Sequence, residues 1–467
     1  MIESKVMGLA AVAPIERQAE SGQLSVTEAR HNIIELAWPA VVEQLLVTMF
    51  GMVDMMMVGG VGPAAIAAIG LTNQPMFLAL AAFQALNVGT TAVVARFIGA
   101  KNFPEANATI RQSLIITAAL GTLMSVLVYI FATQLVTFMG AKDDALRYAI
   151  IYIHVVCLGL LPQTISMSIT AVLRGAGDTR TPMRFNIIAN LVNICGNFVL
   201  INGYLGFPKW GVYGAGFATT LGRLVACALA LSVVFRGNAV LHISLKDKFT
   251  PRMDLIKRIF RIGTPAMLEQ LVMRFGNIAF TKVVAGLGML TYAAHQIGMN
   301  IVSLSFTPGQ GFGMAATSLV GRSLGNRRPD HAELYGWETR RIGMFVAGTM
   351  AVIFFVFGNY VAALYTHDPT VIHQAATSLK IIALVQLFQS SQFILAGALR
   401  GAGDTRWPLI STFIGVAGVR VVLALFFVNV LHLGLVGAWC AMALDQTTRS
   451  MVIYFRYKSN HWKNARV

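Results

Sequence analysis

Charged side chains are scarce in this sequence. Asp, Glu, Lys and Arg make up only 12% of the residues, whereas hydrophobic residues make up 56%. An average soluble domain carries about 25% charged residues. Many windows of roughly 20 residues contain almost no charge, which is the signal of a transmembrane helix. Because these windows have no polar face, we exclude a large soluble core and predict a polytopic helical membrane protein.

Cysteine and several catalytic motifs are also scarce or absent. The chain has no Gly-x-x-x-x-Gly-Lys motif, so ATP is not its internal fuel. It lacks a paired-carboxylate or His/Cys cluster at an aqueous face, which argues against a membrane-embedded transferase. A channel stays an alternative, although the sequence has no filter-like stretch. We therefore predict that it is not an enzyme and carries no cofactor. The four cysteines lie singly inside apolar runs, which disfavours disulfides and metal binding: Cys157, Cys195, Cys227 and Cys440.

Twelve apolar segments follow one another along the chain. They predict an all-α membrane protein with twelve transmembrane helices in two six-helix bundles, 31–235 and 258–457. The longest polar stretch between segments, 236–257, is the predicted linker, and 1–30 and 458–467 are predicted tails, the first partly disordered. The segments span 33–58, 64–94, 112–137, 148–172, 183–204, 212–235, 258–286, 290–320, 342–365, 374–398, 408–431 and 434–457.

The basic residues are distributed unevenly between the loops. Of the 36 lysines and arginines, 28 lie in the tails and in one alternating set of loops, which includes Arg449 in 449–467. Only Lys142, Arg147 and Lys209 lie in the opposite set. Positive charge favours the cytoplasmic side, so the linker and both termini are predicted to be cytoplasmic. We expect a multi-pass protein of the plasma membrane, or of the inner membrane where there are two, and no nucleic-acid partner.

One octapeptide occurs twice and indicates a duplication. Residues 173–180 and 399–406 both have the sequence LRGAGDTR, at an offset of 226 residues. A constant offset at several places indicates an internal repeat. Six crossings separate the copies, so the two halves share one orientation and are predicted to enclose a cavity, as in an alternating-access transporter. The same offset relates Pro39, Glu43, Gln44, Arg96 and Gly99 to Pro265, Glu269, Gln270, Arg322 and Gly325.

The repeated loop has the composition of a tight connection. Gly175 and Gly177 favour backbone conformations that other residues avoid. Asp178 and Thr179 can accept backbone hydrogen bonds at the start of the next helix. Arg174 is predicted to anchor the loop on the cytoplasmic face. These roles are structural, and we place no substrate chemistry in the loop.

The doubled R-G-x-G-D-T loop, the twelve segments and the similar halves resemble the multidrug and toxic compound extrusion (MATE) family. The segment PAVVEQLLVTMFGMVDMMMVGGVGPAAIAAIG, its counterpart PAMLEQLVMRFGNIAF and the following YAAHQIGMN extend the resemblance over nearly the whole chain from about residue 30. It implies secondary active export of amphipathic, often cationic compounds, driven by inward flow of sodium ions or protons. Small amphipathic molecules and the lipid bilayer are then the expected partners, and a monomer is expected.

Asp54 lies in the outer half of the first segment. An ionisable group near the bilayer centre costs about 2.5–3.5 kcal/mol, so such a group is functional or paired. The family pattern V-D-x-x-M-V-G has a cation-binding aspartate at this place, and the resemblance therefore implies a cation-coupling role for Asp54. The alternative is a carboxylate satisfied by hydrogen bonds at a helix end.

The resemblance also implies partners for Asp54 on the fifth and sixth segments. The matching positions are Asn193, Asn197 and Thr219, or Thr220 in place of Thr219. Family members have aspartate where this chain has Asn197, so one carboxylate remains, which favours a proton over a bare sodium ion. Sodium bound by Asp54, Asn193, Asn197 and Thr219 stays an alternative, as does simple helix packing by the asparagines.

Two glutamates are repeat mates in the first and seventh segments. Glu43 and Glu269 each follow a proline by four residues, at roughly mid-membrane depth. Symmetric carboxylates facing one cavity would suit a cationic substrate or a proton. We therefore predict substrate or proton binding in the central cavity by Glu43, Gln44, Glu269 and Gln270. The alternative is pairing of the glutamates with Arg274, Arg223 or another buried base.

Arg420 and Asp445 each lie about a dozen residues into the last two segments, which run in opposite directions. Both side chains are therefore near the midplane, and we predict a structural ion pair that holds the two helices together.

A lipid-linked oligosaccharide flippase of the same broad fold is the competing function. Its cavity should carry more arginine and lysine to bind pyrophosphate. This chain instead has carboxylates in the first and seventh segments, so cation-coupled multidrug export is the leading prediction.

Overall fold

The chain folds into helices that follow the twelve apolar segments. In the computed structural model, the described residues are 24–140, 142–204, 206–236, 242–243 and 250–465, and they form helices and no strands. The predicted tail lies outside these residues up to position 23, as do 237–241 and 244–249 of the predicted linker. The first helix begins at Val26, inside the stretch expected to be the tail.

Six crossings make up the first half. The third crossing consists of two helices, α5 and α6, and the fourth consists of α7 and α8, which meet at Gly159 with a bend of 47°. The helices are α3 (Val26–Gly59), α4 (Pro63–Gly99), α5 (Phe103–Ile130), α6 (Ala132–Phe138), α7 (Asp143–Leu158), α8 (Leu160–Gly175), α9 (Arg180–Asn202) and α10 (Val212–Arg236).

The second half repeats this plan. Its fifth crossing changes helix type along its length, because η1 and η2 are π-helical and therefore wider than an α-helix. The helices are α11 (Met253–Ala285), α12 (Met289–Gly325), α13 (Pro329–Ala363), α14 (Pro369–Ala402), α15 (Arg406–Thr412), η1 (Phe413–Val421), α16 (Val422–Leu425), η2 (Phe426–Val430), α17 (Gly434–Lys458) and the 3₁₀ turn η3 (His461–Asn464).

The length and composition of the helices are those of membrane-spanning helices. Within the described residues, eight helices are long and apolar enough to cross one, and the bent pair α7 and α8 makes a ninth candidate. The helices α11, α12 and α17 complete the twelve crossings, and their polar and charged side chains make them less apolar. Large side chains such as Phe345 and Phe455 stay exposed on the outside, as contact with lipid requires.

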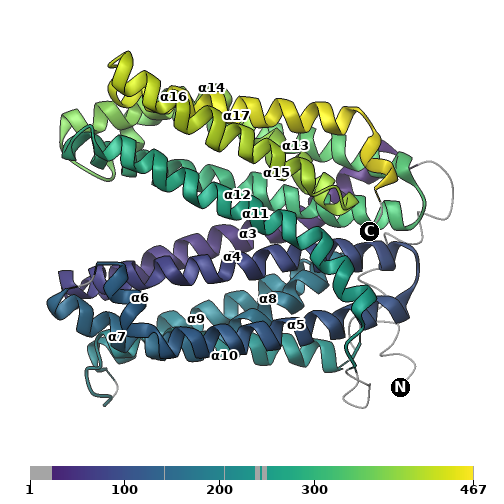
Figure 1. The fold of residues 1–467 in the computed structure, drawn as a ribbon, viewed down its shortest axis with the longest axis horizontal. Coiled ribbons are helices and arrows are strands. Elements are labelled where there is room, and N and C mark those ends of the chain that lie inside the picture. The colour runs from purple at the N-terminus through teal and green to yellow at the C-terminus, as the bar shows by residue number, and fades with distance from the viewer. Residues whose placement is uncertain (1–23, 141, 205, 237–241, 244–249, 466–467) are drawn as a thin grey trace. The chain divides into compact units, whose positions relative to one another are not determined.

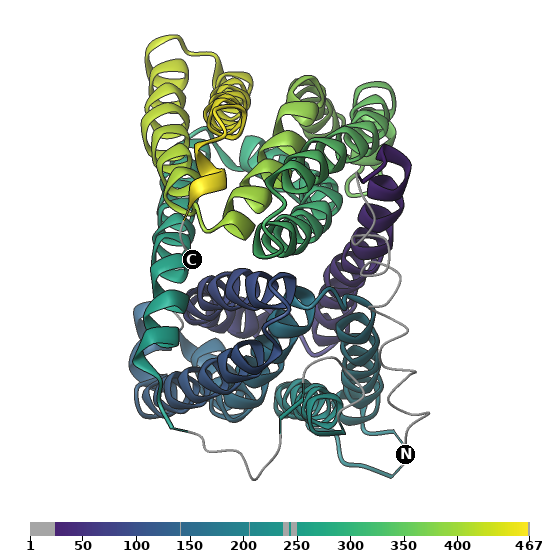
Figure 2. The same ribbon diagram turned by 90° about the vertical axis from the view of Figure 1, so that its right-hand side faces the viewer.

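The helices form two compact units, each with its own apolar core. Unit 1 comprises Val42–Phe260, and unit 2 comprises Arg261–Val467 together with the start of α3, up to Val41. The start of α3 belongs to unit 2 because Ile33 and Leu36 are buried among side chains of α12, α14 and α17. Figures 1 and 2 show the helices of each unit packed side by side.

The glycines of the repeated loop have two different roles. Gly177 and Gly403 adopt left-handed backbone conformations, with φ of 87° and 88°, as predicted for a tight turn. The prediction was wrong for Gly175, which is the last residue of α8 and is helical. A Cβ atom there would lie 2.8 Å from the carbonyl oxygen of Thr91 on α4, so this glycine permits close packing of two helices.

The polar residues of the loop also differ from expectation in one case. Asp178 accepts a hydrogen bond from the backbone N–H of Thr181 at 2.9 Å, as predicted. Thr179 is the N-cap of α9, but its side chain makes no capping hydrogen bond, because Asp178 already fills that role. In the second copy, Asp404 pairs with Arg456 of α17 at 2.8 Å.

Candidate functional site

Asp54 lies in a polar cluster built by three helices of unit 1. Asn197 of α9 is fully buried and donates its amide N–H to Asp54 Oδ1 on α3. One turn earlier on the same face, Asn193 donates to Thr219 Oγ1 of α10 at 3.2 Å. The structure thus brings together the four residues suggested from the sequence. Thr220 points elsewhere, because its hydroxyl donates to the carbonyl oxygen of Val155.

The donor groups of this cluster leave few free oxygens for a bare sodium ion, among them the buried Oδ1 of Asn197, which has no hydrogen-bond partner. Hard cations prefer several oxygen ligands, but the amide of Asn197 presents its N–H to the carboxylate where such an ion would bind. The Thr219 hydroxyl hydrogen is directed at the carbonyl oxygen of Ala215 at 2.9 Å. In the described residues, no three His, Cys, Asp or Glu side chains gather to hold a metal.

Two further residues of the cluster were not predicted. Arg223 of α10 donates from Nη1 to the carbonyl oxygen of Val156 at 3.0 Å and lies in electrostatic range of Asp54. Tyr152 of α7 is buried, and its hydroxyl interacts with Thr219. The repeat offset of 226 residues would have marked Arg223, because it places Arg449 at the equivalent position.

Glu43 is the centre of a second polar cluster in unit 1. Its side chain is buried, and Arg174 pairs with Oε2 at 2.8 Å. Asn186 of α9 donates to Oε1 at 2.5 Å. Arg174 is therefore not the surface anchor that we predicted. As the single arginine of α8, it reaches back toward the first helix, where it neutralises a carboxylate that would otherwise be costly to bury.

Unit 2 repeats this arrangement. Glu269 is buried and pairs with Arg400 of the second repeated loop at 2.6 Å, while Thr412 lies 3.5 Å from the same oxygen. Asn186 and Thr412 are both 143 residues beyond their glutamates. Asn197 follows Asp54 by the same 143 residues, so α3 and α9 run side by side in one register.

The glutamates were predicted to bind substrate or proton in a central cavity, together with the neighbouring glutamines. Gln44 and Gln270 are half-buried beside them. In this structure both carboxylates are occupied by arginines of the repeated loops, so a cation that binds there must displace a guanidinium group.

We expect the pair of Glu43 and Arg174 to show a coupling free energy of about 0.5–3 kcal/mol in a double-mutant cycle. Glu43→Gln and Arg174→Gln each leave one buried group without its partner, whereas the double variant removes both charges. Thermal unfolding of the purified protein in detergent measures the four states. The same cycle at Glu269 and Arg400 is the matched control and should give a similar value. Strictly additive effects at both places would show that the pairs do not stabilise the fold.

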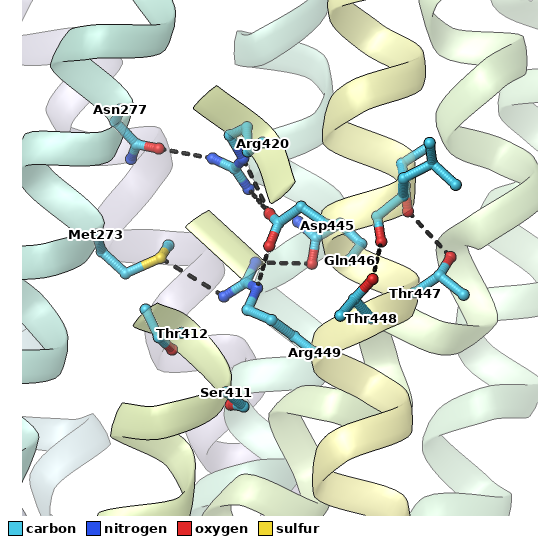
Figure 3. A network of polar contacts seen from close by, with 12 residues as sticks. Met273, Asn277, Ser411, Thr412, Arg420, Asp445, Gln446, Thr447, Thr448 and Arg449 are labelled. Atoms are coloured by element: carbon cyan, nitrogen blue, oxygen red, sulfur yellow. Dashed lines mark hydrogen bonds and ion pairs between the residues drawn. The ribbon is translucent and has the colours of Figure 1, made fainter. Parts of the chain in front are cut away.

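Asp445 is the centre of a buried network in unit 2, which Figure 3 shows. Arg420 of η1 donates to Asp445 Oδ2 through Nε at 2.9 Å and Nη2 at 2.5 Å. Arg449 Nε lies 3.0 Å from the other carboxylate oxygen. The pairing of Arg420 with Asp445 follows the sequence prediction, and Asn277 of α11 binds the same arginine at 2.7 Å.

Arg449 was wrongly assigned to the cytoplasmic segment 449–467. It lies within α17 and is buried, and it also donates to Gln446 at 2.9 Å. Gly415 of η1 faces this network so closely that a Cβ atom would collide with Asp445 and Arg449. The glycine therefore lets the π-helical crossing approach α17, which brings Arg420 to the carboxylate.

The two halves have diverged around one shared arginine. Arg223 and Arg449 are repeat mates, and Thr219 has Asp445 as its mate. In unit 2 the carboxylate stands on the same helix as the arginine, four residues away. In unit 1 the carboxylate, Asp54, comes from a different helix.

Comparison with known proteins gives one family. The family described as MatE matches residues 39–199 and 265–426, two stretches that begin 226 residues apart. The chain is 32% identical over 446 residues to "Probable multidrug resistance protein NorM" of Thermotoga maritima, covering 95% of each. It is 28% identical over 443 residues to "Multidrug resistance protein MdtK" of Pectobacterium atrosepticum, covering 93% of this chain and 96% of that protein.

A solved structure has the same fold. It is described as the outward-facing conformation of a multidrug resistance MATE family transporter of the MOP superfamily. The match has a TM-score of 0.86 at 26% identity and covers 92% of this chain and 96% of that one.

Proposed function

The chain belongs to the MatE family of membrane transporters, and on that premise we propose that it is a multidrug efflux protein that exports amphipathic, cationic molecules in exchange for protons. The names of its relatives support multidrug efflux. Alternating access by two similarly oriented halves suits a duplicated chain of this kind.

One observation carries the choice of the proton. Asp54 is held by the neutral amide of Asn197, in a cluster whose other suggested ligands, Asn193 and Thr219, are neutral too. A lone carboxylate of this kind can accept one proton or face one monovalent cation, and it cannot hold both charges at once. Binding of a cationic cargo and binding of a proton are therefore mutually exclusive at Asp54, which is the requirement for exchange.

The membrane potential favours the same scheme. Expelling a monovalent cation works against roughly 2.3 kcal/mol per 100 mV. If one proton returns for each cation exported, no net charge crosses the membrane. The pH gradient alone then drives export, and the potential does not oppose it.

The test is transport of tetraphenylphosphonium in proteoliposomes, with pH and sodium gradients imposed separately. We expect a pH gradient without sodium to drive uptake into vesicles that have an acidic interior, and a sodium gradient at constant pH to drive none. Liposomes without protein give the background. Uptake driven by sodium alone would refute the proton as the coupling ion and would indicate that the asparagine-rich cluster is a sodium site.

We also propose that the connections rich in basic residues face the cytoplasm, as do both termini. Ala100 and Asn326 are exposed repeat mates in two of these connections, and Phe207 and His367 are exposed in connections of the opposite set. The four cysteine variants are made in a cysteine-free background and treated with an impermeant thiol reagent in intact cells. The reagent should label Phe207→Cys and His367→Cys. It should label Ala100→Cys and Asn326→Cys only after the membrane has been permeabilised. The reverse pattern would invert the topology.

A further inference from the structure

Carbonyl groups at the break in the fourth crossing accept hydrogen bonds from side chains of other helices. The last carbonyls of a helix have no intrahelical donor, and α7 ends at Leu158 in the middle of its crossing, where α8 continues at an angle of 47°. The carbonyl oxygen of Val156 accepts from the backbone N–H of Gly159 at 3.1 Å, and side chains of neighbouring helices add further donors. Three consecutive carbonyl oxygens, those of Val155, Val156 and Cys157, accept hydrogen bonds from Thr220 at 2.9 Å, Arg223 at 3.0 Å and Ser125 at 2.6 Å.

Arg223 is the one cation among these three donors. The carboxyl end of a helix carries a partial negative charge, which favours a guanidinium group. Gly159, at the break, also makes room for the side chain, because a Cβ atom there would lie only 3.0 Å from Arg223 Cδ. Broken helices in transporters commonly direct their carbonyl ends at a coupling cation. Here that place is taken by a cation that the chain itself supplies.

The guanidinium group of Arg223 faces Asp54 without being fixed to it. Asp54 accepts its hydrogen bond from Asn197, and Arg223 donates to Val156, so the opposite charges interact across a longer distance than an ion pair. Tyr152 of α7 is a further titratable group in electrostatic range of Asp54. The helix α9 contributes only neutral amides. His154, also on α7, packs its ring on Tyr129 with centroids 4.7 Å apart.

The repeat mate shows what a fixed arrangement looks like. Arg449 has its carboxylate, Asp445, one turn away on the same helix at 3.0 Å, with Arg420 on the other side. That site holds its charges in a closed network. In unit 1 the equivalent of Asp445 is Thr219, so the arginine has kept its place while the fixed carboxylate is absent.

We propose that Arg223 is a tethered counter-cation for Asp54, which competes with the positive charge of the cargo and sets the pH at which Asp54 takes up its proton. This inference rests on the proposed coupling role of Asp54. Arg223 is a positioning residue, since it acts on cargo and proton through the carboxylate. In this role Arg223 takes the place of a sodium ion, because the cation at the broken helix end is part of the chain itself.

The sign of the expected effect follows from electrostatics. A nearby positive charge favours an ionised carboxylate. Removing the positive charge of Arg223 makes Asp54 easier to protonate. Asp54 then keeps its proton up to a higher pH. Once Asp54 is ionised, a cationic cargo no longer competes with the guanidinium group and binds more tightly. A neutral molecule of similar shape gains nothing.

The experiment measures proton release on addition of tetraphenylphosphonium to the purified full-length protein, followed with a pH indicator dye from pH 5 to pH 9. Arg223→Gln should move the midpoint of release upward by about one pH unit, the lower end of the effect of a nearby charge. It should also strengthen tetraphenylphosphonium binding at alkaline pH. Arg223→Lys keeps the charge and should keep the midpoint. Neutral triphenylphosphine oxide should show no change in affinity in any variant.

A purely structural role predicts lower melting temperatures in both variants and an unmoved midpoint, and that result overturns the proposal. If Arg223→Gln does not fold, Arg223→Met replaces it, because methionine keeps an apolar stem and removes the charge. An unmoved midpoint in folded Arg223→Met also overturns the proposal. Asp54→Asn is measured in parallel. If it still releases protons, the proposed function itself fails, whatever the result at Arg223.

Discussion

Asp445→Ala should lower the free energy of unfolding by about 3–5 kcal/mol, as expected when a buried charge pair loses one partner. The side chain of Asp445 is fully buried between two guanidinium groups, with Arg420 at 2.5 Å and Arg449 at 3.0 Å. Its removal leaves two buried positive charges with no carboxylate between them. Their mutual repulsion adds to the cost of keeping each of them away from water.

Arg420→Ala should have a smaller effect, because Asp445 keeps Arg449 as its partner. Removal of the arginine also leaves Asn277 without its hydrogen bond, so we still expect a loss of stability. Denaturant unfolding or melting of the detergent-solubilised protein measures both variants. Thr448→Ala is the matched control on α17, since its hydroxyl bonds only to its own helix and its loss should change stability by less than about 0.5 kcal/mol.

The structural role of the pair is open to refutation. If Asp445→Ala and Arg420→Ala were both as stable as the parent protein and lost transport, the pair would be part of the transport cycle and would not be a tether between helices.

The sequence was sufficient to place the crossings and the depth of Arg420 and Asp445 within them. Apolar runs of about 20 residues determine where the crossings lie, and the offset of 226 residues determines which crossings are equivalent. Depth alone also suggested the pairing of Arg420 with Asp445, because two antiparallel neighbours bring residues of equal depth together. Predictions of this kind need no knowledge of which helix faces lie in contact.

Pairings between residues of different apparent depth could not be predicted in this way. Arg174 belongs to a loop motif, and a long arginine side chain at a helix end is expected to extend toward water. It turns inward to Glu43 of α3 at 2.8 Å, a contact between helices far apart in the sequence that a sequence pattern does not reveal. Its repeat mate behaves in the same way.

Helix ends were the other source of error. Arg449 was counted with the cytoplasmic segment 449–467, although it lies inside the predicted apolar segment 434–457. An acidic residue four positions before a basic one is a recognisable pattern on a helix. The kinked fourth crossing was equally invisible, since α7 and α8 form one apolar run. That break is what gives Arg223 its carbonyl partner.

Asp54→Asn should fold normally and lose proton release on drug binding. The amide has the shape of the carboxylate and can still accept a hydrogen bond from Asn197, so stability should change by less than about 0.5 kcal/mol. It cannot be deprotonated, so it has neither a proton to give up nor a negative charge to offer a cationic cargo. The exposed carboxylate of Asp254, which pairs with Arg252, provides the control.

The measurement is proton release from energised vesicles on addition of tetraphenylphosphonium. Wild-type protein and Asp254→Asn should release protons at equal rates, and Asp54→Asn should not exceed empty vesicles. Glu43→Gln should lower stability yet keep proton release, because Arg174 already neutralises Glu43 in this structure. That contrast separates a coupling carboxylate from a structural one. Asp54→Asn that exchanges protons for drug at the normal rate would rule out Asp54, and loss of release in Glu43→Gln alone would transfer the role to Glu43.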